Sequence, residues 1–462
     1  MGKYFGTDGI RGIVNKALTP MLAYKCAVAC GYLIKQDNPN AKIIIGSDTR
    51  ISKDMLLGAM ISGFCYVGVD VVHIGVLPTP ALAFLIDRMG ADVGVMISAS
   101  HNPYEYNGIK ILAKGGIKLA DEKENEIEAL IDNFDIPPAD KMGSLSYNHM
   151  AKDFYCEHIK QVCETDISGF NVIIDCANGA TSETAELIFN SLGVKSKIYH
   201  NKPDGMNIND GCGSTHIDEL CRLVLKNGAD IGFAFDGDAD RCLAVDSKGQ
   251  LIDGDKIMAV IAMHLKKQNR LKYNTLVATV MSNLGLAEKM KENGIEVVTT
   301  TVGDRYVLEK MLDKGYVFGG ENSGHIIFLE KATTGDGMLT AIMLLCAMRE
   351  LDLSGQDVFD VFTAYPQKQI NVTADDLQKQ KLMSDDVFIN DIKKAEQFLV
   401  NSGFSAAEHG IFLSARHAGR AGNLERHQKR STRHPCCLPA DHAVYCRCYR
   451  TDRTYRVPSA AP

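Results

Sequence analysis

The sequence predicts an α/β protein whose chain divides into four segments, three of them α/β. Short apolar runs rich in β-branched residues alternate with longer stretches of helical periodicity, which is the pattern of strand and helix units. The length of 462 residues also calls for several domains, because single cores stop growing beyond roughly 250–300 residues. One large doubly wound sheet with insertions is the alternative.

Seven short apolar runs are expected to form buried strands, at residues 42–46, 69–74, 92–97, 172–175, 231–235, 276–280 and 297–302. The segment 54–67 lies between the first two runs and predicts a helix, because its apolar residues recur close to every 3.6 positions. The first two runs and this helix form one strand, helix, strand unit.

Turn-forming and charged residues mark joints near residues 136–140, 247–250 and 365–367. We therefore expect α/β domains at residues 1–150, 151–248 and 249–366. A partial C-terminal domain is expected at 367–415, followed at 416–462 by an atypical tail that is disordered or not native.

The composition limits the partners. A net charge of −7 argues against nucleic acid held by neutralised phosphates. The longest apolar runs, such as residues 341–348, are far shorter than the roughly 20 residues that cross a bilayer. Ten scattered cysteines before residue 400, with no apolar signal core at the start, favour reduced thiols in the cytoplasm. The oligomeric state is left open.

The tail differs in composition from the rest of the chain. Residues 416–462 contain nine Arg and one Lys, whereas the preceding 415 residues contain eight Arg. Its four cysteines, Cys436, Cys437, Cys446 and Cys448, lack the spacing of a zinc ribbon. A basic disordered arm, or a segment foreign to the protein, would explain this composition.

Three aspartates suggest a metal site. Asp236, Asp238 and Asp240 follow the strand expected at 231–235, and ligands bind at the carboxyl ends of strands in open α/β sheets. An EF-hand is excluded, because Arg241 stands where that loop requires Gly. Few protein ligands leave the open positions that Mg²⁺ prefers, so we expect Mg²⁺, with a solvated turn as the alternative.

A serine loop follows the strand expected at 92–97. Ser100, His101 and Lys110 are expected to place a hydroxyl, an imidazole and an amine within one short loop. Alone, Ser100 would be interpreted as a serine bonded to its own backbone. A nucleophile together with a metal site indicates phosphoryl transfer, which depends on positioning and charge neutralisation.

Other Gly-framed polar loops are weaker signals. Residues 319–325 combine an acid, an amide, a hydroxyl and an imidazole, which could read sugar hydroxyls. Residues 303–305 and 6–12 are similar charged loops. No P-loop is present in the sequence, which disfavours a kinase that uses ATP.

Together these motifs resemble the α-D-phosphohexomutases, most closely the bacterial members that act on glucosamine phosphates. The resemblance covers about residues 3–400 and rests on the loops at 5–12, 98–103, 236–241 and 321–325. It implies three tandem α/β domains with mixed sheets around a central cleft, and a fourth C-terminal domain. It also implies interconversion of glucosamine 6-phosphate and glucosamine 1-phosphate through a bisphosphate, for UDP-N-acetylglucosamine and cell-wall precursor synthesis.

The resemblance assigns roles to individual residues. Ser100 would carry a phosphoryl group, and one Mg²⁺ would lie between it and the three aspartates. Arg11, Lys110 and His101 would assist the phosphoserine and the proton transfer. The phosphosugar would be bound by Glu321, Ser323, His325, Arg241, Asp304 and Arg305.

The C-terminal part departs from the family. The phosphate-binding motif Arg-x-Ser-Gly-Thr-Glu-Pro is absent, and we hypothesise that the reading frame is lost between Gly403 and Ser414. Losing charge-assisted hydrogen bonds of about 1.5–3 kcal/mol each would weaken substrate binding about tenfold or more. Two further functions therefore stay open: a mutase for mannose or glucose phosphates, and a poorly active phosphosugar-binding homologue.

Overall fold

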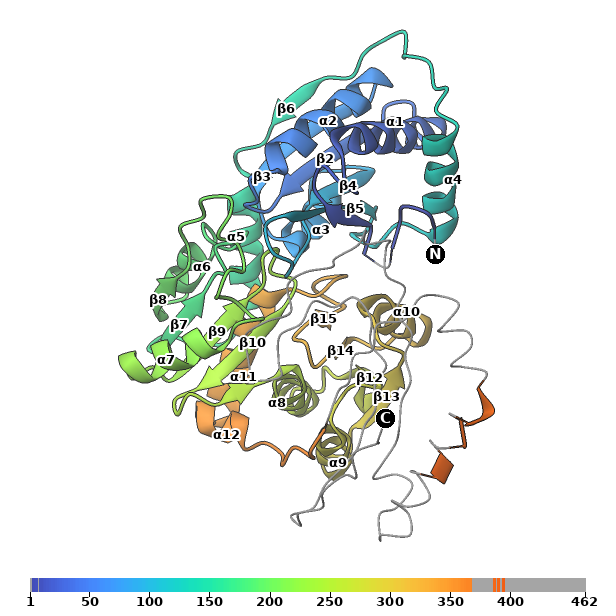
Figure 1. The fold of residues 1–462 in the computed structure, drawn as a ribbon. Helices are drawn as coiled ribbons and strands as arrows, with labels where there is room; N and C mark the ends of the chain where they lie inside the picture. Colours follow the sequence, from blue (N-terminus) through green and yellow to red (C-terminus); the bar gives the residue numbers. More distant parts are fainter. Residues whose placement is uncertain (1, 7, 368–384, 388, 391–392, 395–462) are drawn as a thin grey trace, which may run out of the picture.

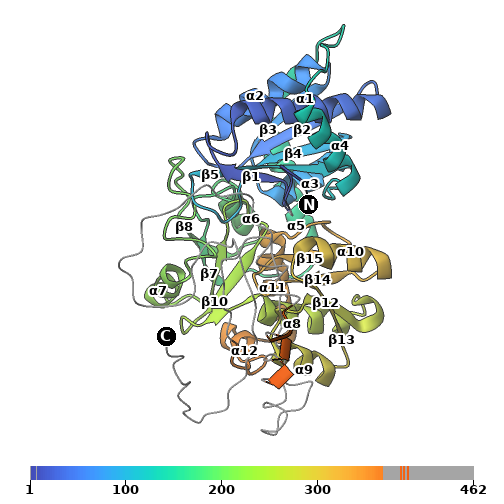
Figure 2. The same ribbon diagram turned by 45° about the vertical axis from the view of Figure 1, so that its right-hand side comes forward.

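A computed structural model describes residues 2–6, 8–367, 385–387, 389–390 and 393–394 (Figure 1). It confirms three tandem α/β units with mixed sheets, and three lobes are visible in two orientations (Figures 1 and 2). The tail at 416–462, the segment of the proposed frame loss and most of the expected C-terminal domain lie outside the described residues.

The first unit contains a sheet of six strands in the order β1-β5-β4-β2-β3-β6. These strands are β1 (Ile10–Ile13), β2 (Lys42–Ser47), β3 (Asp70–Val76), β4 (Val93–Ile97), β5 (Tyr106–Ala113) and β6 (Leu145–Tyr147). The central strands β4, β2 and β3 run parallel, whereas β5 runs antiparallel to both β4 and β1.

Helices cover both faces of this sheet. Helices α1 (Pro20–Asp37), α2 (Lys53–Tyr66) and α4 (Asp121–Asp132) share one core with Ile43 and Ile45, whereas α3 (Thr79–Arg88) shares the other core with Ile44. Successive side chains of a strand point to opposite faces. An unbroken apolar run is therefore what β2 needs to be buried on both sides.

The second unit contains a sheet of five strands in the order β11-β10-β9-β7-β8. These are β7 (Asn171–Asp175), β8 (Lys195–Tyr199), β9 (Ile231–Phe235), β10 (Cys242–Asp246) and β11 (Leu251–Ile252). Helix α7 (Asp218–Asn227) packs on one face, while α5 (Ala151–Val162) and α6 (Ala185–Ser191) share the core on the other.

The third unit contains a sheet of four strands in the order β13-β12-β14-β15. These are β12 (Thr275–Thr279), β13 (Glu296–Thr300), β14 (Phe318–Gly320) and β15 (Ile326–Phe328), and a 3₁₀ turn η1 (Lys272–Asn274) precedes β12. Helix α10 (Asp304–Lys314) covers one face, and α8 (Gly254–Lys267) and α9 (Leu284–Glu292) share the core on the other.

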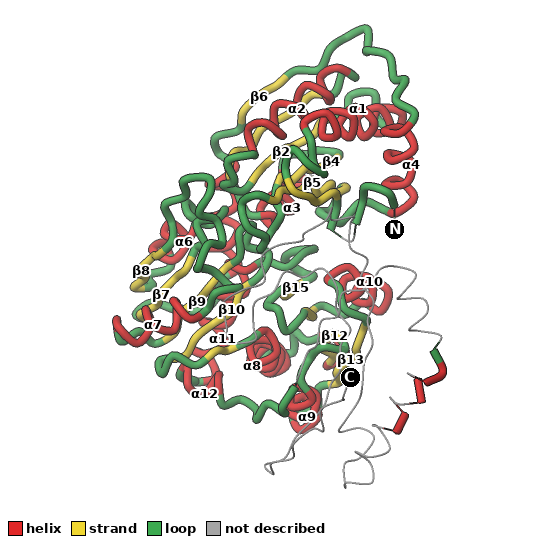
Figure 3. The backbone as a smooth tube through the Cα atoms, in the orientation of Figure 1, coloured by secondary structure: helices red, strands yellow, loops and turns green. Residues whose placement is uncertain are grey.

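One hydrophobic core contains residues of all three units and joins the second unit to the third. Helix α11 (Gly337–Leu351) follows the third sheet yet contacts β9, β10 and α8, and α12 (Gly355–Phe359) contacts β10 and β11. Figure 3 shows α11 running between the two lobes. Residues 247–250, expected to be a joint, form the turn of the β10–β11 hairpin, so the second sheet extends to Ile252.

All seven expected strands are confirmed, with ends that differ by at most two residues. The helix expected at 54–67 is confirmed as α2. No helix among the described residues is long and apolar enough to cross a membrane.

A buried hydrogen bond connects α5 to the start of α11. The Tyr155 hydroxyl donates to Asp336, 2.9 Å from Oδ1, and Oδ1 of Asp336 also accepts the Leu339 N–H that caps α11. Both residues are buried, and burial raises the pKa of Asp336 to about 6. This carboxyl group therefore depends on its donors.

Replacing Tyr155 by Phe is expected to lower the free energy of unfolding by about 1–3 kcal/mol, because a buried carboxyl group loses a donor. The midpoint of urea unfolding of the full chain measures the effect. Tyr273→Phe is the control, since Tyr273 is 71% exposed. Equal midpoints for the two variants would contradict the prediction.

Candidate active site

Each sheet contributes one polar loop between a parallel strand and the antiparallel strand that follows it. The loops are residues 98–105 between β4 and β5, 236–241 between β9 and β10, and 321–325 between β14 and β15. The first is the serine loop, the second the aspartate loop and the third the sugar loop. Side-chain contacts bring the three loops together, from Ser100 to Asp236 and from Asp240 to His325.

The serine loop has a strained backbone at its central residue. Ser100 adopts φ of 52° and is buried, and its N–H donates to Ser98 Oγ at 2.9 Å. A left-handed conformation is uncommon for a residue other than glycine, and it persists only where the surroundings enforce it. The loop therefore fixes the direction of the Ser100 hydroxyl.

The fully buried Arg50 enforces this conformation. Its guanidinium donates to the carbonyl oxygens of Ser100, Asn102, Pro103 and Tyr106. Its charge is compensated by Asp48, whose Oδ2 lies 2.8 Å from Nε and also accepts the Ser98 hydroxyl. Five guanidinium donors in a rigid fork suit this clustering of carbonyl groups.

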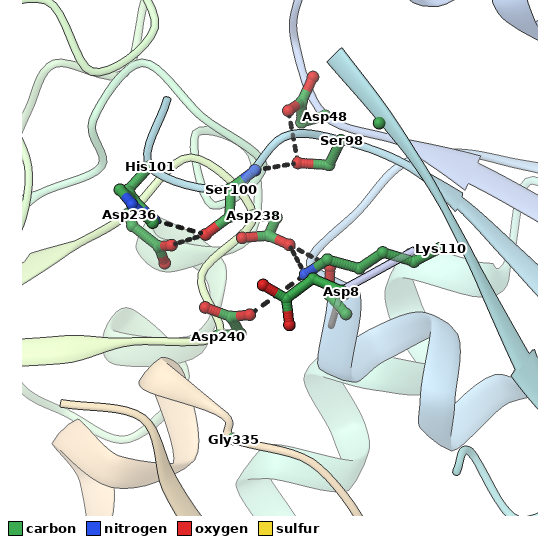
Figure 4. A network of polar contacts seen from close by, with 12 residues as sticks. Asp8, Asp48, Ser98, Ser100, His101, Lys110, Asp236, Asp238, Asp240 and Gly335 are labelled. Carbon is green, nitrogen blue, oxygen red and sulfur yellow. Dashed lines mark hydrogen bonds and ion pairs between the residues drawn. The ribbon is translucent and has the colours of Figure 1, made fainter. Parts of the chain in front are cut away.

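The hydroxyl of Ser100 meets the aspartate loop. Ser100 Oγ donates to Asp236 Oδ2 at 2.6 Å and lies 3.3 Å from Nδ1 of His101 (Figure 4). Burial, with the cationic Arg241 and Arg11, lowers the pKa of His101 well below its usual range. A neutral imidazole beside a hydroxyl can exchange a proton with it.

The three aspartates converge as the sequence predicts. Asp236, Asp238 and Asp240 are buried, and each offers an oxygen within 4.8 Å of the others. Burial and the neighbouring carboxylates raise the pKa of Asp236 well above its usual value. The Oδ1 atoms of Asp238 and Asp240 are buried without a hydrogen-bond partner among the described residues.

These orphaned carboxylate oxygens fit a hard divalent cation, which takes oxygen ligands and would offset the mutual repulsion of the trio. The three aspartates and Ser100 Oγ would hold it. The fit rests on the donor set and on the unpaired oxygens.

Lys110 bridges two of the aspartates. Its Nζ lies 2.9 Å from Asp238 Oδ2 and 3.3 Å from Asp240 Oδ2, and Asp238 Oδ2 also accepts the Thr79 hydroxyl. Burial opposes the charge on Lys110, but the two carboxylates outweigh it and raise the pKa of the ammonium group. The expectation that Lys110 lies within the serine loop is wrong: it lies on β5, opposite Met96 of β4.

Two arginines present guanidinium donors in the same region, and Arg241 Nε lies 3.9 Å from Asp240 Oδ1 as an ion pair. Arg11 lies on β1, 3.2 Å through Nη1 from Asp8 Oδ2, and Arg241 ends the aspartate loop. The Nε atoms of both are buried without hydrogen-bond partners among the described residues. Such guanidinium donors suit phosphate oxygens.

The sugar loop joins the aspartate loop through His325. Its Nδ1 lies 3.8 Å from Asp240 Oδ2, and its Nε2 accepts the Gly335 N–H and lies 3.9 Å from Asp304 Oδ2. Glu321 accepts the Ser323 hydroxyl at 3.3 Å and the Gly303 N–H at 3.0 Å. These groups are hydrogen-bonding groups of the kind that bind sugar hydroxyls.

Arg305 lies at the start of α10, and its side chain pairs with residues outside the three loops. Its guanidinium forms ion pairs with Asp121 at 2.5 Å and with Glu309 at 2.6 Å. It thereby connects the first unit to the third.

Several residues of the site are absent from the sequence-based prediction. Asp48 and Arg50 lie two and four residues after the strand predicted at 42–46, which is a signal that could have identified them. Asn209 lies in an irregular loop and gives no such signal, yet its Nδ2 donates to the carbonyl oxygens of Ser100 at 2.9 Å and Asn102 at 3.0 Å.

Gly237 allows this close approach. A side chain there would lie 2.6 Å from the Ser100 carbonyl oxygen and 2.9 Å from Asn209 Nδ2. The aspartate loop can therefore lie against the serine loop only with glycine at this position.

Comparison with protein families matches all three units in order. Residues 2–136 match phosphoglucomutase/phosphomannomutase alpha/beta/alpha domain I, residues 153–249 match domain II, and residues 253–365 match domain III.

Curated relatives agree with these matches. The chain is 47% identical over 407 residues to a phosphoglucosamine mutase of Clostridioides difficile strain 630, covering 87% of this chain and 91% of the relative. It is 46% identical over 408 residues to a phosphoglucosamine mutase of Acetivibrio thermocellus, with the same coverage.

Solved structures share the fold. A phosphoglucomutase/phosphomannomutase family protein from Burkholderia thailandensis superposes with a TM-score of 0.72 at 26% identity, covering 83% of this chain and 84% of that one. An N-acetylglucosamine-phosphate mutase of the α-D-phosphohexomutase superfamily gives a TM-score of 0.55 at 16% identity, covering 81% and 84%. With three matched domains and close relatives over most of its length, the chain belongs to the phosphoglucomutase/phosphomannomutase family of α-D-phosphohexomutases.

Proposed function

We propose that the protein is an isomerase that interconverts glucosamine 6-phosphate and glucosamine 1-phosphate, supplying UDP-N-acetylglucosamine and cell-wall precursor synthesis. The observation that carries the proposal is the 2.6 Å contact between Ser100 Oγ and Asp236, beside two buried aspartate oxygens that have no hydrogen-bond partner among the described residues. The curated relatives named phosphoglucosamine mutase support glucosamine over mannose or glucose as the sugar.

The reaction begins from Ser100 carrying a phosphoryl group. A hydroxyl oxygen of the sugar phosphate bonds to phosphorus as the bond to Ser100 Oγ breaks, which gives a sugar bisphosphate. The bisphosphate reorients, and Ser100 Oγ takes the other phosphoryl group. No net hydrolysis occurs, because the phosphoryl group moves between hydroxyl oxygens. When bound, Mg²⁺ would supply charge neutralisation for the phosphoryl group on Ser100.

The chain's own residues position the groups and move protons. Neutral His101, 3.3 Å from Ser100 Oγ, is placed to accept or return the serine proton. Lys110 lies among the aspartates as a cation, so it stabilises negative charge on the departing oxygen, while the proton of the sugar hydroxyl passes to Ser100 Oγ. The Nε atoms of Arg11 and Arg241, which have no hydrogen-bond partner among the described residues, would donate to phosphate oxygens.

The sugar loop orients the substrate. When the substrate binds, Glu321 and Ser323 replace the hydrogen bond between them with hydrogen bonds to sugar hydroxyls. His325 and Asp304 hold the loop against Asp240, and Arg305 keeps α10 against Asp121. We also propose a cytoplasmic location and domain boundaries near residues 150 and 366, whereas the boundary expected at 248 lies inside the β10–β11 hairpin of the second unit.

Replacing Ser100 by Ala is expected to lower kcat by about a thousandfold or more, because the phosphoryl acceptor is lost. A coupled assay with glucosamine 6-phosphate measures the rate, and peptide mass spectrometry detects phosphate on Ser100. Ser144→Ala, at an exposed serine of the first unit, is the control. Full activity of Ser100→Ala would exclude the mutase mechanism. Equal rates on mannose or glucose phosphates would contradict the proposed specificity for glucosamine phosphates.

Removal of divalent metal by a chelator is expected to abolish turnover, and added Mg²⁺ to restore it. Asp238→Asn should raise the Mg²⁺ concentration for half-maximal activity, and weaken Mg²⁺ binding measured by calorimetry, by about tenfold or more, because one charged ligand is lost. Asp210→Asn, at an exposed aspartate, is the matched control. Unchanged activity in chelator would contradict the metal site.

Asn209→Asp is expected to lower kcat by about ten- to a hundredfold with KM nearly unchanged. The variant keeps the size of the side chain and its tolerance for the left-handed backbone at φ of 57°. It replaces a donor by a charged acceptor facing two carbonyl oxygens. Asn15→Asp, at an exposed asparagine with φ of 61°, is the control. A parallel change in KM and kcat would argue against a positioning role.

A further inference from the structure

A second cluster of metal-type ligands lies at the carboxyl edge of the second sheet, apart from the aspartate trio. Asp175 ends β7, His200 directly follows β8, and Cys212 lies in the loop before α7. One ligand atom of each lies within 4.8 Å of the others. We propose that these three residues bind a transition-metal ion of the Zn²⁺ type.

The Asp175 carboxylate is already oriented as a metal ligand would be. Its Oδ1 accepts the Ala177 N–H at 2.9 Å, and its Oδ2 accepts the Gly213 N–H at 2.9 Å. Oδ2 keeps a second lone pair, whereas the second lone pair of Oδ1 faces His200 Nδ1. Ligating carboxylates are typically held by such outer hydrogen bonds.

The imidazole of His200 faces this carboxylate. Its Nδ1 lies 3.0 Å from Asp175 Oδ1 and forms an ion pair with it when the imidazole is protonated. A metal ion bound by both groups would replace the proton between them. Because 28% of the side chain is exposed, an ion can reach the cluster past His200.

Cys212 completes the cluster with a thiol. It is fully buried, and burial, followed by the charges of Asp175 and Asp210, raises its pKa to about 12. The thiol is therefore protonated and a poor nucleophile, so a Cys-His-Asp hydrolytic site is not supported. A metal ion would replace the proton on sulfur.

The ligand set selects the kind of metal. One sulfur, one nitrogen and one oxygen suit Zn²⁺ and Co²⁺, whereas Mg²⁺ takes oxygen ligands. Three protein ligands leave one tetrahedral position for water. The aspartate trio contains only oxygen, so the two sites differ in selectivity.

The test titrates the metal-free full chain with Co²⁺ in excess Mg²⁺, which saturates the aspartate trio. We expect one Co²⁺ per chain, with a thiolate-to-cobalt absorption band in the near ultraviolet that Zn²⁺ abolishes. A Co²⁺ ion held by aspartates alone cannot give this band, so the readout does not depend on the proposed mutase activity.

Substitutions identify the residues that give rise to the absorption band. Cys212→Ala should remove it, and His200→Asn should weaken Co²⁺ binding about tenfold or more. Asparagine tolerates the left-handed φ of 48° at this position, so this variant tests the site even if Cys212→Ala fails to fold. Cys156→Ala and Asp238→Asn should leave the band unchanged.

The cysteines of the tail need their own control. A full chain with Cys436, Cys437, Cys446 and Cys448 replaced by Ser should keep the band. The proposal is overturned if no band forms, if the band follows the tail cysteines, or if it survives both Cys212→Ala and His200→Asn.

Discussion

The buried guanidinium of Arg50 is the interaction on which the active site depends. It collects four carbonyl oxygens of the segment from Ser100 to Tyr106, and its charge is compensated by Asp48. A buried charge that lost these acceptors would cost several kcal/mol, so the segment cannot relax while Arg50 stays in place. The left-handed backbone of Ser100 follows from this constraint. The nucleophile is therefore oriented by carbonyl groups of its own loop before any substrate binds.

The fold brings distant residues together by repeating one supersecondary motif three times. In each sheet a parallel strand ends in a polar loop and returns as an antiparallel strand, and the three loops belong to β4 and β5, β9 and β10, and β14 and β15. A hairpin fixes both ends of its loop, so each loop is short and held by a sheet. Contact between the units then aligns the loops: Ser100 reaches Asp236, and Asp240 approaches His325. Helix α11 reinforces this alignment, because it follows the third sheet but packs on the second.

The sequence was informative where chemistry and periodicity coincide. The apolar runs predicted the parallel strands, and aspartates placed directly after one run predicted the trio that the structure brings to Ser100. The sequence misplaces Lys110, because β5 contains no long unbroken apolar run that would predict a strand. Asn209 could not be found, since an irregular loop gives no periodic signal and its partners are backbone carbonyls 109 and 107 residues away. The Cys-His-Asp cluster could not be predicted for the same reason. Its members lie at one edge of the sheet, but their spacing in the sequence matches no metal-binding motif.

The two metal-type clusters are connected by hydrogen bonds between their loops. Asn209, which holds the serine loop, lies three residues before Cys212, and its N–H donates to Ala177 in the loop that follows Asp175. The same loop meets the aspartate loop, because Ala180 donates to the carbonyl oxygen of Gly237. An ion bound by Asp175, His200 and Cys212 would restrain both loops at once. Coupling between two binding sites is reciprocal. If that ion changes the affinity of the serine loop for a ligand, the ligand must therefore change the affinity of the cluster for the ion by the same factor. The second sheet thus links the proposed transition-metal site to the nucleophile by two loops rather than by direct contact.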